Sequence, residues 1–142
     1  MAWASGVGNG RRINGKQMSA KFLAVVEDIF FLAKIQQTAR QLGLAVEAVQ
    51  PDALKARLED ENAAAVLLDL NHRSGKAISL IESLKGGPST RSVPVIAFLS
   101  HVQGELAQAA RSAGCDRVMA RSAFSQQLAT ILRDLSKEVP GN

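Results

Sequence analysis

Residues 63–75 read AAAVLLDLNHRSG, an apolar run that ends at Asp69 and continues into a polar loop with Asn71, His72 and Gly75. An unbroken apolar run of this length is typical of a strand buried on both faces, as strands of parallel sheets are. The run carries one carboxylate to its carboxyl end, where the loop begins. We therefore expect Asp69 to lie at the edge of a parallel sheet, where it can meet residues that follow other strands.

Further short apolar segments alternate along the chain with segments of helical periodicity. The predicted strands cover 21–26, 44–49, 64–70, 93–100 and 117–120, and the predicted helices cover 29–43, 51–62, 75–86, 104–114 and 124–137. The first helix shows the pattern well, because Phe31, Ile35 and Leu42 are spaced three or four residues apart and Gly43 suits a left-handed cap. Five strand–helix units predict one α/β domain with helices on both faces of a parallel sheet.

The composition fits this single domain and argues against several classes of function. The chain has 142 residues, of which 46% are hydrophobic and 21% are charged, which is enough apolar material for one core. Residues 1–17 carry three basic residues and no acid, which leaves +1 of the net charge of +4 for the rest. We expect 1–17 to be a disordered extension or tag, 18–142 to be the folded domain, and nucleic acid not to be a partner.

The chain also lacks the sequence signals of export. It has no apolar stretch near the ~20 residues that a membrane span needs, and its start lacks the apolar region of a signal peptide. The single Cys115 cannot form an internal disulfide, and we interpret it as a packing residue. We therefore expect a cytoplasmic protein without membrane contact.

Three acids lie at the carboxyl ends of two predicted strands. Glu27 and Asp28 come directly after the first strand, and Asp69 is the second-to-last residue of the third. The carboxyl ends of parallel strands meet at one edge of such a sheet, and ligands bind there. Carboxylates that converge raise one another's pKa unless a cation or a basic side chain lies between them. The pattern predicts a charged site at this edge.

Four motifs in order resemble the receiver domain of two-component response regulators, the CheY-like family. They are ED after the first strand, VLLDLN at the third, VPVIAFLS at the fourth and AGCDRVMARS at the fifth, and the resemblance covers residues 20–137. It implies a flavodoxin-like, doubly wound sheet of five parallel strands in the order 2-1-3-4-5. It also implies a signalling protein rather than an enzyme.

The resemblance implies a chemistry for the edge of the sheet. Asp69 matches the residue that accepts a phosphoryl group from a histidine kinase or a phosphotransfer protein. The matching Mg²⁺ ligands are Glu27, Asp28, Asp69 and the backbone carbonyl of Asn71. A hard cation bound by oxygens lets a carboxylate attack an anionic phosphate. The output partner would be a protein that binds the face of the fourth helix, fifth strand and fifth helix, and a homodimer is also open.

Several positions depart from the family pattern. The hydroxyl position after the fourth strand falls on Leu99, and Ser100, one place later, is a candidate substitute although a one-residue shift turns a strand side chain to the other face. Arg121 stands where the family has Lys, and a guanidinium keeps the charge but not the shape. Val118 stands where the family has an aromatic ring. We expect atypical switching.

Two readings of the function remain open from the sequence. The first is a stand-alone receiver domain that accepts phosphate on Asp69 and signals by protein contact. The second is a pseudo-receiver, an interaction scaffold that works without phosphorylation. Counting back from Gly43 shifts the acidic pair to Val26 and Glu27, which puts one metal ligand in doubt and weakens the first reading.

Overall fold

The computed structural model describes residues 20–100 and 104–137. In these ranges five strands alternate with helices. The strands are β2 (Lys21–Val25), β3 (Ala45–Ala48), β4 (Ala65–Asp69), β5 (Val95–Leu99) and β6 (Arg117–Ala120). The helices are α1 (Ile29–Gln41), α2 (Pro51–Asp60), α3 (Ala77–Gly86), α4 (Gly104–Ser112), α5 (Arg121–Gln126) and α6 (Leu128–Ser136).

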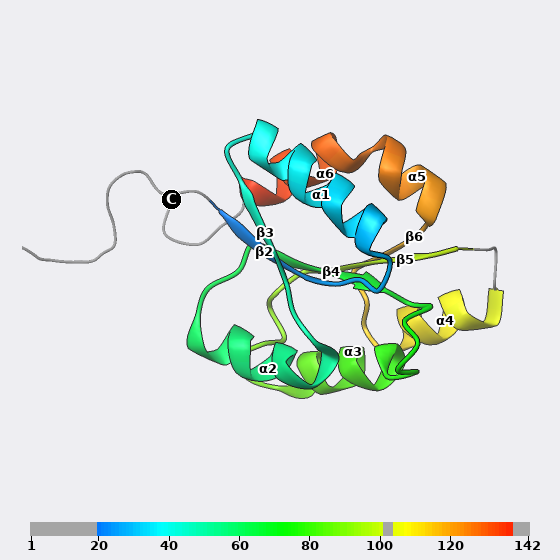
Figure 1. The fold of residues 1–142 in the computed structure, drawn as a ribbon. Coiled ribbons are helices and arrows are strands. Elements are labelled where there is room, and N and C mark those ends of the chain that lie inside the picture. Colours follow the sequence, from blue (N-terminus) through cyan, green and yellow to red (C-terminus); the bar gives the residue numbers. More distant parts are fainter. Residues whose placement is uncertain (1–19, 101–103, 138–142) are drawn as a thin grey trace, which may run out of the picture.

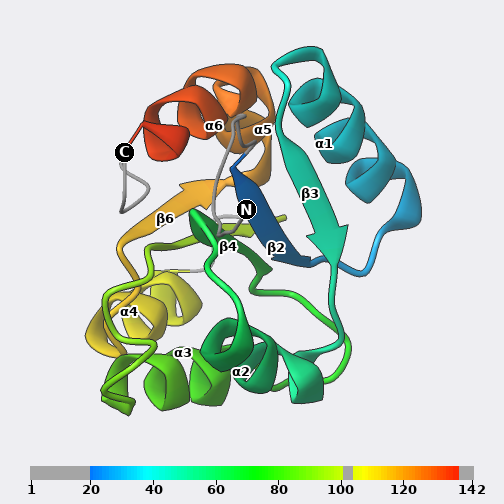
Figure 2. The same cartoon turned by 90° about the vertical axis from the view of Figure 1, so that its left-hand side faces the viewer.

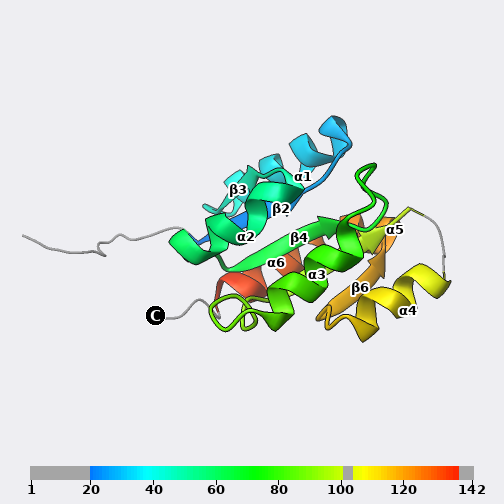
Figure 3. The ribbon, with the colours of Figure 1, turned by 90° about the horizontal axis from the view of Figure 1, so that it is seen from below.

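The strands form one parallel sheet in the order β3-β2-β4-β5-β6. Numbered by their order in the chain, this is the predicted order 2-1-3-4-5. Helices α1, α5 and α6 cover one face, and α2, α3 and α4 cover the other (Figures 1 and 2). Figure 3, a view from below, shows α2, α3 and α4 lying along this second face of the sheet. The predicted α/β class, strand order and two helical layers are confirmed.

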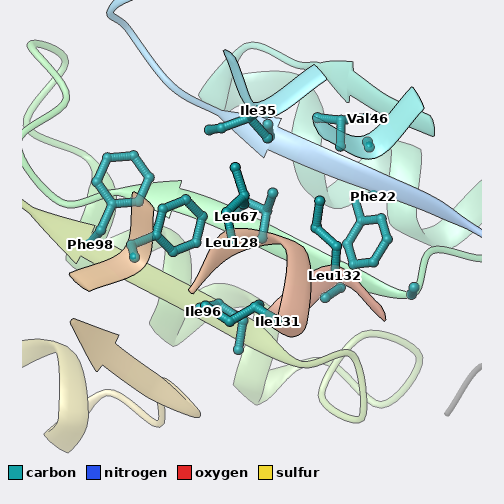
Figure 4. Close-up of a cluster of buried hydrophobic side chains, with 14 of the residues drawn as sticks. Phe22, Ile35, Val46, Leu67, Ile96, Phe98, Leu128, Ile131 and Leu132 are labelled. Carbon is teal, nitrogen blue, oxygen red and sulfur yellow. The ribbon is translucent and has the colours of Figure 1, made fainter. Parts of the chain in front are cut away.

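Strand β4 is the centre of the core, because all five of its residues are buried. Its alternating side chains serve both layers: Leu67 belongs to the cluster under α1 and α6, and Leu68 to the cluster under α2 and α3. Figure 4 shows Leu67 and Phe98 among the side chains of the first cluster. Burial on both faces explains why this strand reads as a continuous apolar run in the sequence.

An aromatic cluster lies on the α1 side of the sheet. The ring of Phe98 stacks on Phe124 of α5 with centroids 4.8 Å apart, and it meets the edge of Phe31 of α1 at 5.2 Å. Aromatic pairs in these geometries stabilise a core by about 0.5–1.5 kcal/mol beyond the area they bury. The cluster ties the first turn of α1 to β5 and to α5.

Two predicted helices begin at other residues than expected, and the helices expected over 29–43, 51–62 and 104–114 each end two residues earlier. The predicted helix 124–137 is two helices: α5 begins directly after β6 at Arg121, and the chain leaves helical geometry at Gln127 (φ −100°, ψ 7°) before α6. The predicted helix 75–86 begins at Ala77 instead, because Gly75 adopts a positive φ of 71° in the preceding turn.

The proposed boundary at residue 18 and the extension 1–17 lie outside the described residues. None of the described helices is long and apolar enough to cross a membrane.

Candidate functional site at the carboxyl edge of the sheet

Asp69 ends β4 and is 5% exposed. Its Oδ1 accepts a hydrogen bond from the backbone N–H of Asn71 at 2.9 Å. Burial raises the pKa of the Asp69 carboxyl, and the backbone amides of Asn71 and Glu27 and the charge of Arg121 oppose that shift. The structure therefore keeps this carboxylate away from water and offsets only part of the cost with donors and positive charge.

Asp28 lies at the same edge and caps helix α1. One oxygen, Oδ1, accepts hydrogen bonds from the backbone N–H groups of Phe30 at 2.9 Å and Phe31 at 3.1 Å. The other, Oδ2, accepts from Nη2 of Arg121 at 2.6 Å. The hydrogen bond from Arg121, together with the two backbone bonds, holds the pKa of Asp28 below its ordinary value. Both oxygens of this carboxylate are therefore engaged by groups of the chain.

Arg121 is the first residue of α5 and follows β6 without a loop. Besides its bond to Asp28, its guanidinium carbon lies 4.0 Å from the centroid of the Phe31 ring. A guanidinium over an aromatic face is attracted by the quadrupole of the ring. The contacts with Asp28 and with the Phe31 ring thus hold the guanidinium of Arg121, which stands where the resemblance has a lysine.

Glu27 is held by the loop that follows Asp69. Its Oε1 accepts from the backbone N–H of Arg73 at 2.6 Å, and its Oε2 pairs with Nε of the same residue at 2.5 Å. This arginine was missed in the sequence, where nothing in the loop residues NHRSG distinguishes it from an ordinary solvent-exposed side chain. Its backbone and side chain together engage both oxygens of Glu27.

The chain departs from the family pattern at the end of β5 and within β6. Leu99 is 4% exposed and packs in the core cluster on the α2, α3 and α4 side, and Val118 packs against the same cluster. Ser100 is exposed, and its backbone N–H donates to Oδ1 of Asn71 at 2.7 Å. The side chain of Asn71 therefore links the loops after β4 and β5, a role that the sequence did not indicate. The use of the Asn71 carbonyl and the Ser100 hydroxyl stays a prediction.

The predicted metal ligands are oxygen donors, which suits a hard cation such as Mg²⁺. Within residues 20–100 and 104–137, however, no group of three or more His, Cys, Asp or Glu side chains is arranged to hold a metal ion. Arginine side chains meet both Asp28 and Glu27 instead. The side chains of Arg73 and Arg121 thus supply positive charge at this edge.

No protein-family model and no curated protein matches this sequence. Solved structures do match. The signal receiver domain of a signal transduction histidine kinase from Syntrophus aciditrophicus is 18% identical, with a TM-score of 0.75 over 87% of this chain and 95% of that one. The phosphorylated cyanobacterial phytochrome response regulator RcpA is 17% identical, with a TM-score of 0.68 over 87% and 96% of the two chains. The Mn²⁺-bound form of the response regulator Rcp1 is 14% identical, with a TM-score of 0.69 over 84% and 96%. This chain therefore has the flavodoxin-like fold of response-regulator receiver domains.

Proposed function

We propose that this chain is a signalling receiver domain that accepts a phosphoryl group on Asp69 and acts by contact with another protein. The observation that carries the proposal is the position of this buried carboxylate at the end of the central strand, at the edge where Asp28 and Arg121 also meet. The donor would be a histidine kinase or a phosphotransfer protein, as the resemblance implies. The location would be cytoplasmic.

The step is a substitution at phosphorus. A carboxylate oxygen of Asp69 forms a bond to the phosphorus atom while the bond from phosphorus to the donor breaks, and the leaving group keeps the electron pair. The product is an acyl phosphate. Two anions meet in this step, so a nearby positive charge lowers its barrier. Arg121 supplies such a charge, and a guanidinium can donate two hydrogen bonds to phosphoryl oxygens.

The resemblance implies Mg²⁺ as the cation, held by Glu27, Asp28, Asp69 and the carbonyl of Asn71. The ligand types fit this ion, but the arrangement does not, because the side chain of Arg121 already pairs with Asp28 and that of Arg73 with Glu27, where a bound cation would meet a like charge.

The test is the intact mass of the protein after incubation with acetyl phosphate, with and without MgCl₂. We expect a gain of one phosphoryl group in the wild type and in Asp60→Asn, which changes an exposed acid of α2 and serves as a control. We expect no gain in Asp69→Asn. A wild type that stays unmodified in both conditions would end the proposal.

A second candidate function is an interaction scaffold that works without phosphorylation. It is favoured by Leu99, which fills the hydroxyl position with a buried apolar side chain. Its contact surface would be α4, the edge strand β6 and the predicted helix 124–137, which the structure divides into α5 and α6; the residues of β6 are half-buried or exposed. If the chain is a scaffold, Asp69→Asn would bind the partner as tightly as the wild type does. If it is a receiver that works by phosphorylation, the same substitution would abolish the effect of the phosphodonor on that binding.

A further inference from the structure

We infer that the guanidinium of Arg121 takes the place of a divalent cation at the carboxyl edge of the sheet, so that the wild-type protein does not bind a metal there. This inference concerns the site of the proposed function but does not require Asp69 to be phosphorylated. It goes against the metal set that the resemblance implies, and it rests on the partners of each carboxylate.

Both carboxylate oxygens of Asp28 accept hydrogen bonds from the protein. A metal ligand needs a carboxylate oxygen with a lone pair directed at the ion. The Oδ1 of Asp28 receives two backbone N–H groups in capping α1, and Oδ2 receives the guanidinium of Arg121 at 2.6 Å. Oδ2 keeps one further lone pair, so a cation that bound Asp28 without breaking the cap would lie directly beside the guanidinium or displace it, and a lost cap costs a helix about 1 kcal/mol.

The carboxylate of Glu27 points to Arg73, in the loop after β4. Its two oxygens meet the backbone N–H and the Nε of Arg73. This bidentate contact binds the second acid to a different cationic group. Asp28 and Glu27 are thus paired with two different arginines.

The side chain of Arg121 is held in place by the Phe31 ring and by the backbone from which it starts. The guanidinium lies on the Phe31 ring at 4.0 Å from its centroid, and this ring is itself packed against Phe98 and Phe124. The side chain begins at the first residue of α5, so its backbone is fixed by β6 on one side and by the helix on the other. An arginine held at both ends of its side chain loses little further entropy in this contact.

The charge of Arg121 opposes the binding of a divalent cation at the same carboxylates. The charge of Arg121 acts on Asp69 as well as on Asp28. A divalent ion at the same carboxylates would lie close to this guanidinium, and the repulsion between like charges grows as water is excluded. Mg²⁺ also gives up its water with difficulty and requires near-octahedral ligands. The arginine and the ion therefore compete for one site.

The experiment is a titration of ¹⁵N-labelled protein with MnCl₂, followed by the paramagnetic broadening of backbone amide signals. In the wild type we expect no selective broadening of the amides of residues 27–28 and 69–71. In Arg121→Ala we expect selective broadening there, reversed by excess MgCl₂, with Mn²⁺ binding at least about tenfold tighter because one positive charge is gone. Arg133→Ala, which removes an exposed arginine of α6, is the matched control and should behave as the wild type does.

Arg121→Gln gives a second variant that keeps more of the contact with Phe31, and the dispersion of the same spectra shows whether each variant is folded. Selective broadening in the wild type would overturn the inference. Folded Arg121 variants that gain no broadening would overturn it too, because Arg121 would then not be what keeps the ion out. Neither result depends on acetyl phosphate, so failure here is distinct from failure of phosphorylation at Asp69.

Discussion

The guanidinium of Arg121 donates a hydrogen bond of 2.6 Å to the carboxylate of Asp28, although 93 positions separate them in the chain. The two residues meet because β2 and β6 are parallel members of one sheet and each is followed by a helix at the same edge. Since Asp28 caps α1 and Arg121 begins α5, this contact connects the starts of two helices beside Asp69.

The two roles of Asp28 can be separated by substitution. Asp28→Asn keeps a side-chain oxygen for the cap of α1 but removes the charge that pairs with Arg121, whereas Asp28→Ala removes both. We expect the urea midpoint to fall in the order wild type, Asn variant, Ala variant, with the slope of the transition unchanged. If Ala and Asn variants unfold at the same midpoint, the capping hydrogen bonds do not contribute.

The buried Asp69 carboxylate is expected to cost stability at neutral pH. Burial raises its pKa in the folded state, so the folded protein holds this proton more tightly than the unfolded chain. Stability from this group therefore falls as pH rises through the ordinary aspartate range and beyond. We expect Asp69→Asn to melt at a higher temperature than the wild type at pH 7 and to lose this advantage in acid. A variant that melts lower at pH 7 would show that Arg121 and the backbone donors outweigh burial.

An ion-pair network at the opposite end of the sheet predicts sensitivity to acid. Glu61 accepts from Lys21 at 2.7 Å and from Arg57 at 2.9 Å, and the hydrogen bond from Arg57 is the main cause that lowers the pKa of Glu61 from 4.5 to about 2. A lowered folded-state pKa gives stability that is present above pH 4.5 and is lost as pH falls toward about 2. We expect Glu61→Gln to have a flatter profile of unfolding free energy over this window. Glu59→Gln, in the last turn of α2, is the control and should keep the wild-type slope.

The aromatic cluster predicts a large difference between two phenylalanines. Phe98 is fully buried between Phe31 and Phe124, so Phe98→Ala should lower the free energy of unfolding by about 3–5 kcal/mol. Phe30 is 82% exposed, so Phe30→Ala should change it by less than about 0.5 kcal/mol. Urea unfolding of both variants measures the difference. A comparable loss in Phe30→Ala would mean that this ring packs against something in solution.

Much of the fold could be predicted from the sequence because the signals are local. The apolar run before Asp69 and the spacing of Phe31, Ile35 and Leu42 indicate elements that the structure confirms, and Gly43 has the positive φ of 75° that its position suggests. The start of α5 was missed because Ala120 precedes it without a capping side chain. The break at Gln127 was missed because no Gly or Pro marks it.

The site was less accessible to sequence reasoning because its partners are far apart in the chain. The sequence indicated that Glu27, Asp28 and Asp69 approach one edge and that Arg121 replaces a lysine. It gave no sign that Arg73 would hold Glu27, since that contact depends on the path of the loop after β4. Pairing of Arg121 with Asp28 depends likewise on the packing of α5 against β5 and on the ring of Phe31.

The most direct measurement of the relationship between Arg121 and Asp28 is a crystal structure of the wild-type protein grown in MgCl₂. We predict that the guanidinium lies against Asp28 and the Phe31 ring, with no cation bound to Glu27, Asp28 or Asp69. An Mg²⁺ ion coordinated by these carboxylates and by the carbonyl of Asn71, with Arg121 turned away, would contradict this account.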